Sequence, residues 1–144
     1  MSLNPEIWGP HYWFVLYTIA LSYPLKPNDV SKKKYYDFIQ NLPLFIPDTN
    51  IGDNFSDFLD KYPITPYLDS RESMIKWIHF IHNKINIYLG KPEITYYQAM
   101  KLYYDNYKVK EIKIYDERKN KHKFIFASII ILLIIICIFI IKYK

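Results

Sequence analysis

The sequence predicts an all-α protein, in which a small bundle of helices is followed by a C-terminal transmembrane helix. Three observations lead to this prediction. Apolar residues recur every three or four positions in five segments, no run of any weight shows the alternation of a β-strand, and residues 124–141 carry no charge. A chain of 144 residues is also long enough to bury one sizeable core.

The first two expected helices begin at recognisable capping residues. Asn4-Pro5 or Gly9-Pro10 opens the first helix, because proline is favoured at the first helical position, and the helix stops before Pro24. Asn28-Asp29 caps the second helix. Prolines at positions 43 and 47 then interrupt the chain.

Three further helices follow before the hydrophobic tail. A short one is expected from about Gly52 to Tyr62. A capping box of Asp69 and Glu72 opens the fourth, which Gly90 ends. The fifth is expected over Thr95–Tyr107. The first domain is therefore predicted to cover residues 1–107.

The C-terminal part divides by composition into a charged linker (108–123), a span (124–141) and a short tail (142–144). At ~1.5 Å per residue the span is about 27 Å long, close to the thickness of a bilayer core. A buried core helix is the alternative, but core helices of small domains are rarely so uniformly apolar. We therefore expect a transmembrane helix.

The formal charge of +5 does not indicate a nucleic-acid partner. Residues 117–144 account for all of it, and residues 1–116 hold 13 basic and 13 acidic groups. Basic residues beside a span suit anionic headgroups, and more of them precede the span than follow it. The positive-inside rule then predicts a tail-anchored, single-pass protein with its N-terminal domain in the cytosol, in a host or virion membrane. No signal-peptide pattern is seen at the N-terminus.

Several kinds of chemistry are missing from the sequence. Its three glycines cannot form a Rossmann fingerprint or a phosphate-binding loop. Its one cysteine, Cys137, excludes an intramolecular disulfide and a cysteine-based zinc site. His79 and His82 could ligate a metal as a pair, but no carboxylate follows at ligand spacing, so no metal site is expected.

A polar stripe interrupts the fourth helix, from Trp77 to Asn86. His82 and Asn86 share a helix face, with His79 one turn behind. A buried polar group without a partner costs about 1–3 kcal/mol. The stripe must therefore find partners within the protein or hold something flat and polar.

Two blocks of sequence resemble the Erv/ALR family of FAD-linked sulfhydryl oxidases, and most of all the copies carried by large DNA viruses. The first runs from Trp8-Gly9-Pro10 through Leu16-Tyr17-Thr18 to Tyr23-Pro24. It is similar to the family pattern of Trp-Gly, Trp, Leu-His-Thr and Tyr-Pro. The second includes His82-Asn83-Lys84-Ile85-Asn86 and Leu89-Gly90-Lys91-Pro92, similar to His-Asn-x-Val-Asn and Leu-Gly-Lys.

The resemblance implies a four-helix bundle that grips FAD, with a short fifth helix alongside and pairing as a homodimer. Trp13 would pack on the cofactor, and Tyr17 stands where the family has His. The implied cofactor-binding residues are Gly9, Trp13, Tyr17, His82, Asn83, Asn86 and Lys91. Flat aromatic rings with a few convergent polar groups also suit a heteroaromatic ligand on physical grounds.

The chain departs from the family at the redox pair. The family reads Pro-Cys-x-x-Cys, and here the segment is Pro47-Asp48-Thr49-Asn50-Ile51, so Asp48 and Ile51 occupy the cysteine positions. Neither residue can form a disulfide, and Cys137 lies in the bilayer segment. No catalytic residue is therefore assigned.

Three hypotheses follow from this departure. The first is a degenerate member of the family that keeps the fold and FAD as a membrane-anchored structural or assembly protein. The second is a thiol oxidase that takes its electrons from the dithiol of a viral or redox partner protein. The third is a helical membrane protein unrelated to flavin, in which replacing His82 and Asn86 by Leu leaves stability unchanged or raises it.

Overall fold

The first helix begins at Asn4, which settles the choice between its two expected starts. The computed structural model describes residues 3–142, with side chains for 3–108 and 118–142. Helix α1 spans Pro5–Ser22, and the Asn4 side chain accepts a hydrogen bond from the Glu6 N–H at 2.9 Å. Pro5 stands at the first helical position, where no N–H is needed.

The caps of the next two helices explain where each one starts. Helix α2 spans Asp29–Asn41, and its expected Asn28 cap is confirmed by a 2.8 Å bond from the Ser31 N–H. A 3₁₀ helix, η1, follows over Leu42–Phe45. Helix α3 spans Thr49–Lys61 and starts earlier than expected, because the Asp48 side chain caps it.

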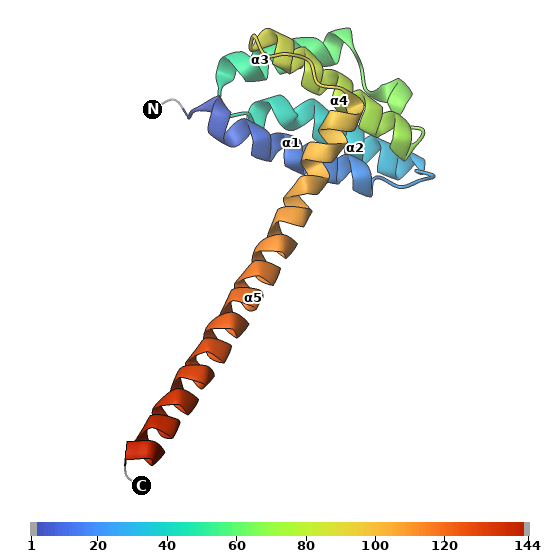
Figure 1. Ribbon diagram of the computed structural model, residues 1–144. Coiled ribbons are helices and arrows are strands. Elements are labelled where there is room, and N and C mark those ends of the chain that lie inside the picture. Colours follow the sequence, from blue (N-terminus) through green and yellow to red (C-terminus); the bar gives the residue numbers. More distant parts are fainter. Residues whose placement is uncertain (1–2, 143–144) are drawn as a thin grey trace. The chain divides into compact units, whose positions relative to one another are not determined.

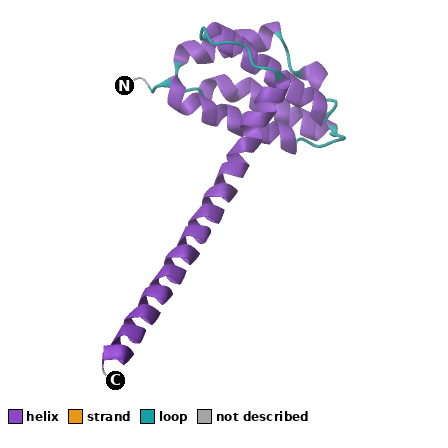
Figure 2. Cartoon of the chain, viewed as in Figure 1, coloured by secondary structure: helices purple, strands orange, loops and turns teal. Residues whose placement is uncertain are grey.

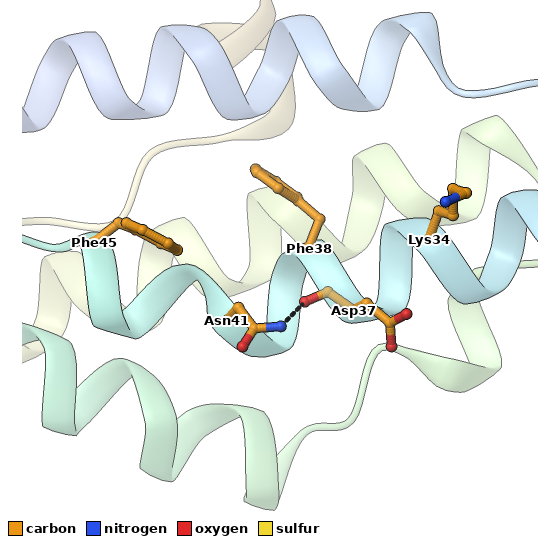
Figure 3. A pocket seen from close by; sticks show the side chains of 5 residues that line it. All are labelled: Lys34, Asp37, Phe38, Asn41 and Phe45. Carbon is orange, nitrogen blue, oxygen red and sulfur yellow. Dashed lines mark hydrogen bonds between the residues drawn. The ribbon is translucent and has the colours of Figure 1, made fainter.

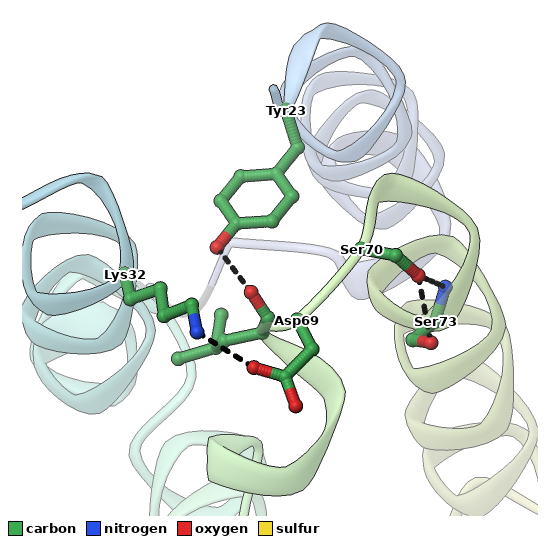
Figure 4. A network of polar contacts seen from close by, with 6 residues as sticks. Tyr23, Lys32, Asp69, Ser70 and Ser73 are labelled. Atoms are coloured by element: carbon green, nitrogen blue, oxygen red, sulfur yellow. Dashed lines mark hydrogen bonds and ion pairs between the residues drawn. The ribbon is translucent and has the colours of Figure 1, made fainter. Parts of the chain in front are cut away.

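The expected capping box of α4 is wrong by one residue. A 3₁₀ helix, η2 (Thr65–Tyr67), leads into α4 (Arg71–Tyr88), whose N-cap is Ser70 rather than Asp69. The Ser70 hydroxyl accepts the Ser73 N–H at 3.1 Å. Asp69 instead forms an ion pair with Lys32 at 2.7 Å, as Figure 4 shows, so its carboxylate is engaged with α2.

Gly90 ends α4, as the sequence predicts. Its φ of +69° lies in the left-handed region that favours glycine. The Gly90 N–H then bonds to the Ile87 carbonyl at 3.0 Å, and the Lys91 N–H bonds to the Asn86 carbonyl at 2.8 Å. This pair of bonds is the Schellman motif, which satisfies the last carbonyls of the helix.

Helix α5 spans Tyr96–Lys142, so the expected fifth helix, linker and span lie on one helix (Figures 1 and 2). Thr95 and Gln98 cap its start reciprocally, with bonds of 2.8 and 3.2 Å. The linker is rich in Lys, which is a good helix former. The structure divides into two compact units, residues 1–103 and 104–144. The domain boundaries 1–107, 108–123 and 124–141 stay a prediction.

The core of the first unit lies where α1 packs along α4 and α3 packs against α4 and η1 (Figure 1). Its buried residues come from all of these elements, from α2 and from the first turns of α5. They include Leu16, Ala20, Ile39, Leu42, Phe55, Leu59, Met74, Trp77, Ile78, Ile81, Ile85 and Ala99. The all-α fold class, a helical bundle with an apolar C-terminal helix, is confirmed.

A polar junction ties the end of α1 to the segment before α4. The Tyr23 side chain is fully buried, and its hydroxyl donates to the Leu68 carbonyl at 2.7 Å (Figure 4). The Arg71 Nε–H donates to the Tyr23 carbonyl. Burial raises the pKa of Tyr23, so its hydroxyl remains a donor. The junction holds α1 and α4 in register, and the site described next lies on those two helices.

Candidate functional site

Helices α1 and α4 bring four rings together, two of them from the polar stripe. Trp13 and Tyr17 lie on α1, and His79 and His82 lie on α4. The Trp13 and His82 rings stack with centroids 4.1 Å apart and planes 19° apart. The Tyr17 ring meets the His82 ring edge-on, with centroids 5.9 Å apart. Residues that are 62 or more positions apart in sequence thus form one aromatic cluster.

The Tyr17 hydroxyl joins the two imidazoles. It lies 3.4 Å from His79 Nδ1 and 3.3 Å from His82 Nδ1. Burial raises the pKa of Tyr17, and the nearby Tyr96 raises it further. The phenol is therefore protonated throughout the physiological range and has one proton to share between the two rings.

Both imidazoles are neutral at pH 7. Burial lowers the pKa of His82 to about 4, and the neighbouring His79 and Lys91 act in the same direction. Burial also lowers the pKa of His79, which Glu93 partly offsets. Each ring therefore carries one N–H donor and one nitrogen acceptor. The cluster is a hydrogen-bonding site without formal charge.

The Asn83 carboxamide is occupied by the backbone of Ile94. Its Nδ2 donates to the Ile94 carbonyl at 2.9 Å, and its Oδ1 accepts the Ile94 N–H at 3.0 Å. Such a pair of bonds fastens the segment after α4 to the helix. Asn83 Nδ2 also lies 3.5 Å from His79 Nε2.

Asn86 is a candidate for contact with a ligand. It is the buried polar residue of the core, at 8% exposure. Among the described residues, none makes a hydrogen bond with its carboxamide, although some of its polar atoms still reach solvent. A buried amide with unused donors and acceptors can bind a polar group on a ligand.

Lys91 follows the C-terminal end of α4, and Gly9 lies in the second turn of α1. Lys91 Nζ forms an ion pair with the Glu6 carboxylate at 2.8 Å, and both side chains are partly exposed. A phosphate could compete with Glu6 for this ammonium. A Cβ built on Gly9 would have no neighbour within 4 Å, so the backbone there is open to close approach.

The start of α3 holds the two residues at the expected cysteine positions. The Asp48 carboxylate accepts the Ile51 N–H at 3.1 Å, and Ile51 is buried at 6% exposure. Gly52 packs so closely that an added Cβ would lie 2.9 Å from the Pro43 carbonyl oxygen. Asp48 therefore serves as a helix cap beside a tightly packed turn.

A match to a family model identifies the family of this chain. The model of the Erv1 / Alr family matches residues 10–109. This is well over half of the chain. The chain belongs to the Erv1/Alr family.

Relatives of this Erv1/Alr chain occur in viruses and in cellular organisms. The probable FAD-linked sulfhydryl oxidase of Acanthamoeba polyphaga mimivirus is 38% identical over 99 residues, covering 68% of this chain and 69% of the relative. The FAD-linked sulfhydryl oxidase of African swine fever virus is 28% identical over 96 residues, covering 67% of this chain and 79% of that one. The mitochondrial FAD-linked sulfhydryl oxidase of Schizosaccharomyces pombe is 32% identical over 84 residues, covering 58% of this chain and 46% of the relative.

Solved structures agree with the family assignment. The yeast Erv1 core superposes with a TM-score of 0.64 at 27% identity, covering 73% of this chain and 87% of that structure. The FAD-binding domain of Erv1 from Saccharomyces cerevisiae gives the same TM-score, covering 72% of this chain and 96% of that domain. The Erv1/Alr bundle is thus present almost in full.

Sequence reasoning did not include His79 and Glu6 among the site residues of this Erv1/Alr chain. His79 contacts the Tyr17 hydroxyl, and Glu6 contacts Lys91. The spacing of His79, three residues before His82 and four before Asn83, carried a signal for the first contact. Nothing in the sequence pairs Glu6 with Lys91.

A separate open hollow of about 370 Å³ lies beside α2 and η1 (Figure 3). Its lining residues are Lys34, Asp37, Phe38, Asn41 and Phe45. The Asn41 amide donates to the Asp37 carbonyl at 2.6 Å within it. None of the four clustered rings lines this hollow, so it is separate from the aromatic cluster.

Proposed function

We propose that this chain is a viral, membrane-anchored, FAD-binding member of the Erv1/Alr family that lacks a dithiol of its own and has a structural or assembly role. The observation that carries the proposal is the single cysteine, Cys137. It lies on the apolar part of α5, within the 25-residue segment Arg118–Lys142 that is long and apolar enough to span a membrane. The mimivirus and African swine fever virus relatives support a viral origin.

The residues that would hold FAD are those that the resemblance implies. They are Gly9, Trp13, Tyr17, His82, Asn83, Asn86 and Lys91. The buried Asn86 carboxamide supports this assignment because it has no hydrogen-bond partner among the described residues, as do the flat faces of Trp13 and His82. Two rings with centroids 4.1 Å apart leave no space for a third between them. A ligand ring must therefore lie outside the pair or separate it.

The missing step is the transfer of electrons from a dithiol. FAD supplies a two-electron acceptor when it is bound, but a donor pair of thiols has to come from cysteines. At the expected positions the chain has the Asp48 cap and the buried Ile51. A carboxylate and an aliphatic side chain cannot be oxidised to a disulfide, so we expect no oxidase activity from the chain alone.

Restoring the two thiols tests this proposal directly. Residues at the N-cap and three positions later on a helix lie within disulfide reach, and a helix N-terminus favours a thiolate. The full chain, purified in detergent, should show flavin absorbance, and a small dithiol with oxygen should give no peroxide above a protein-free FAD control. The double variant Asp48→Cys with Ile51→Cys should gain dithiol-dependent peroxide release by at least tenfold.

The two single variants, Asp48→Cys and Ile51→Cys, are the matched controls, because neither can close a disulfide between positions 48 and 51. Rapid peroxide release from the unmodified chain would contradict the proposal. So would bleaching of its flavin by a protein dithiol in stopped-flow measurements, which would instead support a thiol oxidase that uses a partner's dithiol. A colourless, folded chain would refute FAD binding.

A further inference from the structure

The Asn83 carboxamide has a fixed orientation. Two backbone bonds to Ile94 define which atom is nitrogen and which is oxygen, because the Ile94 N–H can only donate and the Ile94 carbonyl can only accept. The NH₂ group is therefore the atom that lies 3.5 Å from His79 Nε2. An NH₂ group has no acceptor capacity, so His79 Nε2 must accept.

This orientation sets the proton of His79. A neutral imidazole carries one proton, and burial keeps His79 neutral at pH 7 by lowering its pKa. Because Nε2 accepts from Asn83, the proton stands on Nδ1. His79 Nδ1–H then donates across 3.4 Å to the Tyr17 hydroxyl oxygen.

The direction of the last bond follows in the same way. The Tyr17 hydroxyl has one proton and already accepts from His79, so its own O–H is directed to His82 Nδ1 at 3.3 Å. His82 Nδ1 accepts, and the single proton of His82 stands on Nε2. No described residue makes a hydrogen bond with His82 Nε2.

We propose that the relay from Asn83 through His79 and Tyr17 fixes His82 in the Nε2–H tautomer, so that His82 presents an uncharged donor to the bound ligand. Tyr17 acts as the positioning residue of this relay. Trp13 covers one face of His82, so the acceptor atom lies in the plane of the imidazole, beyond its edge. A neutral donor suits a neutral acceptor on the ligand, such as a ring nitrogen, a carbonyl or a hydroxyl oxygen. That the ligand is a flavin dinucleotide rests on the proposed function.

Other ionisable groups around the relay leave this assignment unchanged. The Tyr96 ring lies edge-on to His79, with centroids 5.7 Å apart. Glu93 favours the protonated form of His79, and Lys91 disfavours that of His82. Burial is the largest effect on the pKa of both rings, and it favours the neutral forms that the relay needs.

Nitrogen NMR of the histidines tests the relay on the full chain in detergent micelles. The sequence holds four histidines, so the two-bond ¹H–¹⁵N spectrum of histidine-labelled protein is small, and His11→Gln and His122→Gln assign the other two. We expect protonation of Nδ1 in His79 and of Nε2 in His82. Protonation of His79 on Nε2, or of His82 on Nδ1, would overturn the proposal.

Variants of the relay separate its function from simple packing. Tyr17→Phe keeps the ring but removes the hydroxyl, so His82 should become a mixture of tautomers and FAD should bind about tenfold more weakly. His79→Phe should likewise leave His82 as a mixture of tautomers, because the Tyr17 hydroxyl no longer accepts from His79 and can then either donate to His82 Nδ1 or accept from it. Tyr103→Phe, which removes a hydroxyl that lies 3.1 Å from Thr18 Oγ1, is the packing control and should change neither readout.

The outcomes distinguish this inference from the proposed function. The expected tautomers in a chain that binds no FAD would refute the ligand assignment and the proposed function, while the relay would stand. FAD binding with the opposite tautomers would refute the relay alone. An unchanged His82 signal in a folded Tyr17→Phe variant would also refute it.

Discussion

His82 is held neutral by its surroundings, which has a consequence for stability at acidic pH. Its pKa is lowered from 6.5 to about 4, mainly by burial. Between these two values the unfolded chain binds a proton that the folded chain does not bind. The stabilising contribution is therefore complete above pH 6.5 and is lost as the pH falls towards 4.

We predict that His82 alone lowers the free energy of unfolding by about 3 kcal/mol between pH 7 and pH 4. Replacing it by Gln removes the titrating group and should flatten the dependence in this range. Denaturant titration of the full chain in detergent, followed by tryptophan fluorescence, gives the free energy of unfolding at each pH. Its slope against pH is then compared between the variants. His11→Gln on the exposed part of α1 is the control. Equal slopes for the wild type and His82→Gln would contradict the prediction.

At the scale of the helices, two glycines have opposite surroundings although both lie inside helices. Gly52 in α3 is buried against η1, and an added Cβ would lie 2.9 Å from the Pro43 carbonyl oxygen. Gly9 in α1 has no atom within 4 Å of such a Cβ. Helix propensity alone favours Ala over Gly by about 1 kcal/mol at either position. Packing therefore decides whether alanine stabilises or destabilises the protein at position 52, whereas helix propensity decides it at position 9.

We expect Gly52→Ala to destabilise the bundle by about 1–3 kcal/mol, because a backbone oxygen cannot move aside as a side chain can. Gly9→Ala should stabilise the chain without ligand by up to about 1 kcal/mol. It should also weaken FAD binding if the cofactor approaches Gly9 as proposed. Thermal unfolding with and without added FAD measures both effects. A Gly52→Ala variant with unchanged stability would contradict this prediction, because it would show that η1 can move aside for the added methyl group.

At the scale of the whole molecule, α5 combines two environments along one helix. Its first turns contribute Ala99 and Tyr103 to the core of the bundle. The segment Arg118–Lys142 is apolar enough to span a membrane, and the side chains of that segment are exposed. Basic residues stand before the apolar run and fit the anionic cytosolic leaflet. We infer that the helix anchors the bundle on the cytosolic side.

Placing charge in the middle of the span tests the anchor. Arginine near the centre of a transmembrane helix costs about 2.5–3.5 kcal/mol per residue. Ile131→Arg with Ile135→Arg should therefore release the chain from the membrane fraction after alkaline extraction, whereas Ile131→Leu with Ile135→Leu should not. Protease added to intact microsomes should digest the bundle of the unmodified chain. Protection of the bundle would reverse the inferred topology.

Local signals predicted much of the secondary structure, and the exceptions lie at the starts of α4 and α3. Asn28 and Gly90 act at the ends of their helices as expected, because capping depends on neighbours within a few residues. Asp69 was wrong as a cap because the Ser70 hydroxyl caps the helix one residue later, and Asp69 pairs instead with Lys32, 37 residues away in sequence. Asp48, considered only as a substitute for cysteine, proved to be the cap of α3.

The candidate site also combines features that local sequence predicts with features that depend on the folded chain. Motifs within single helices were enough to predict the family, the all-α fold and the missing cysteine pair, because residue identity and spacing carry that information directly. The contact between Tyr17 and both histidines needed α1 to be packed along α4. The direction of the proton relay also needed the Ile94 backbone beside Asn83. Hydrogen-bond direction and burial depend on groups distant in sequence, so only the folded chain decides them.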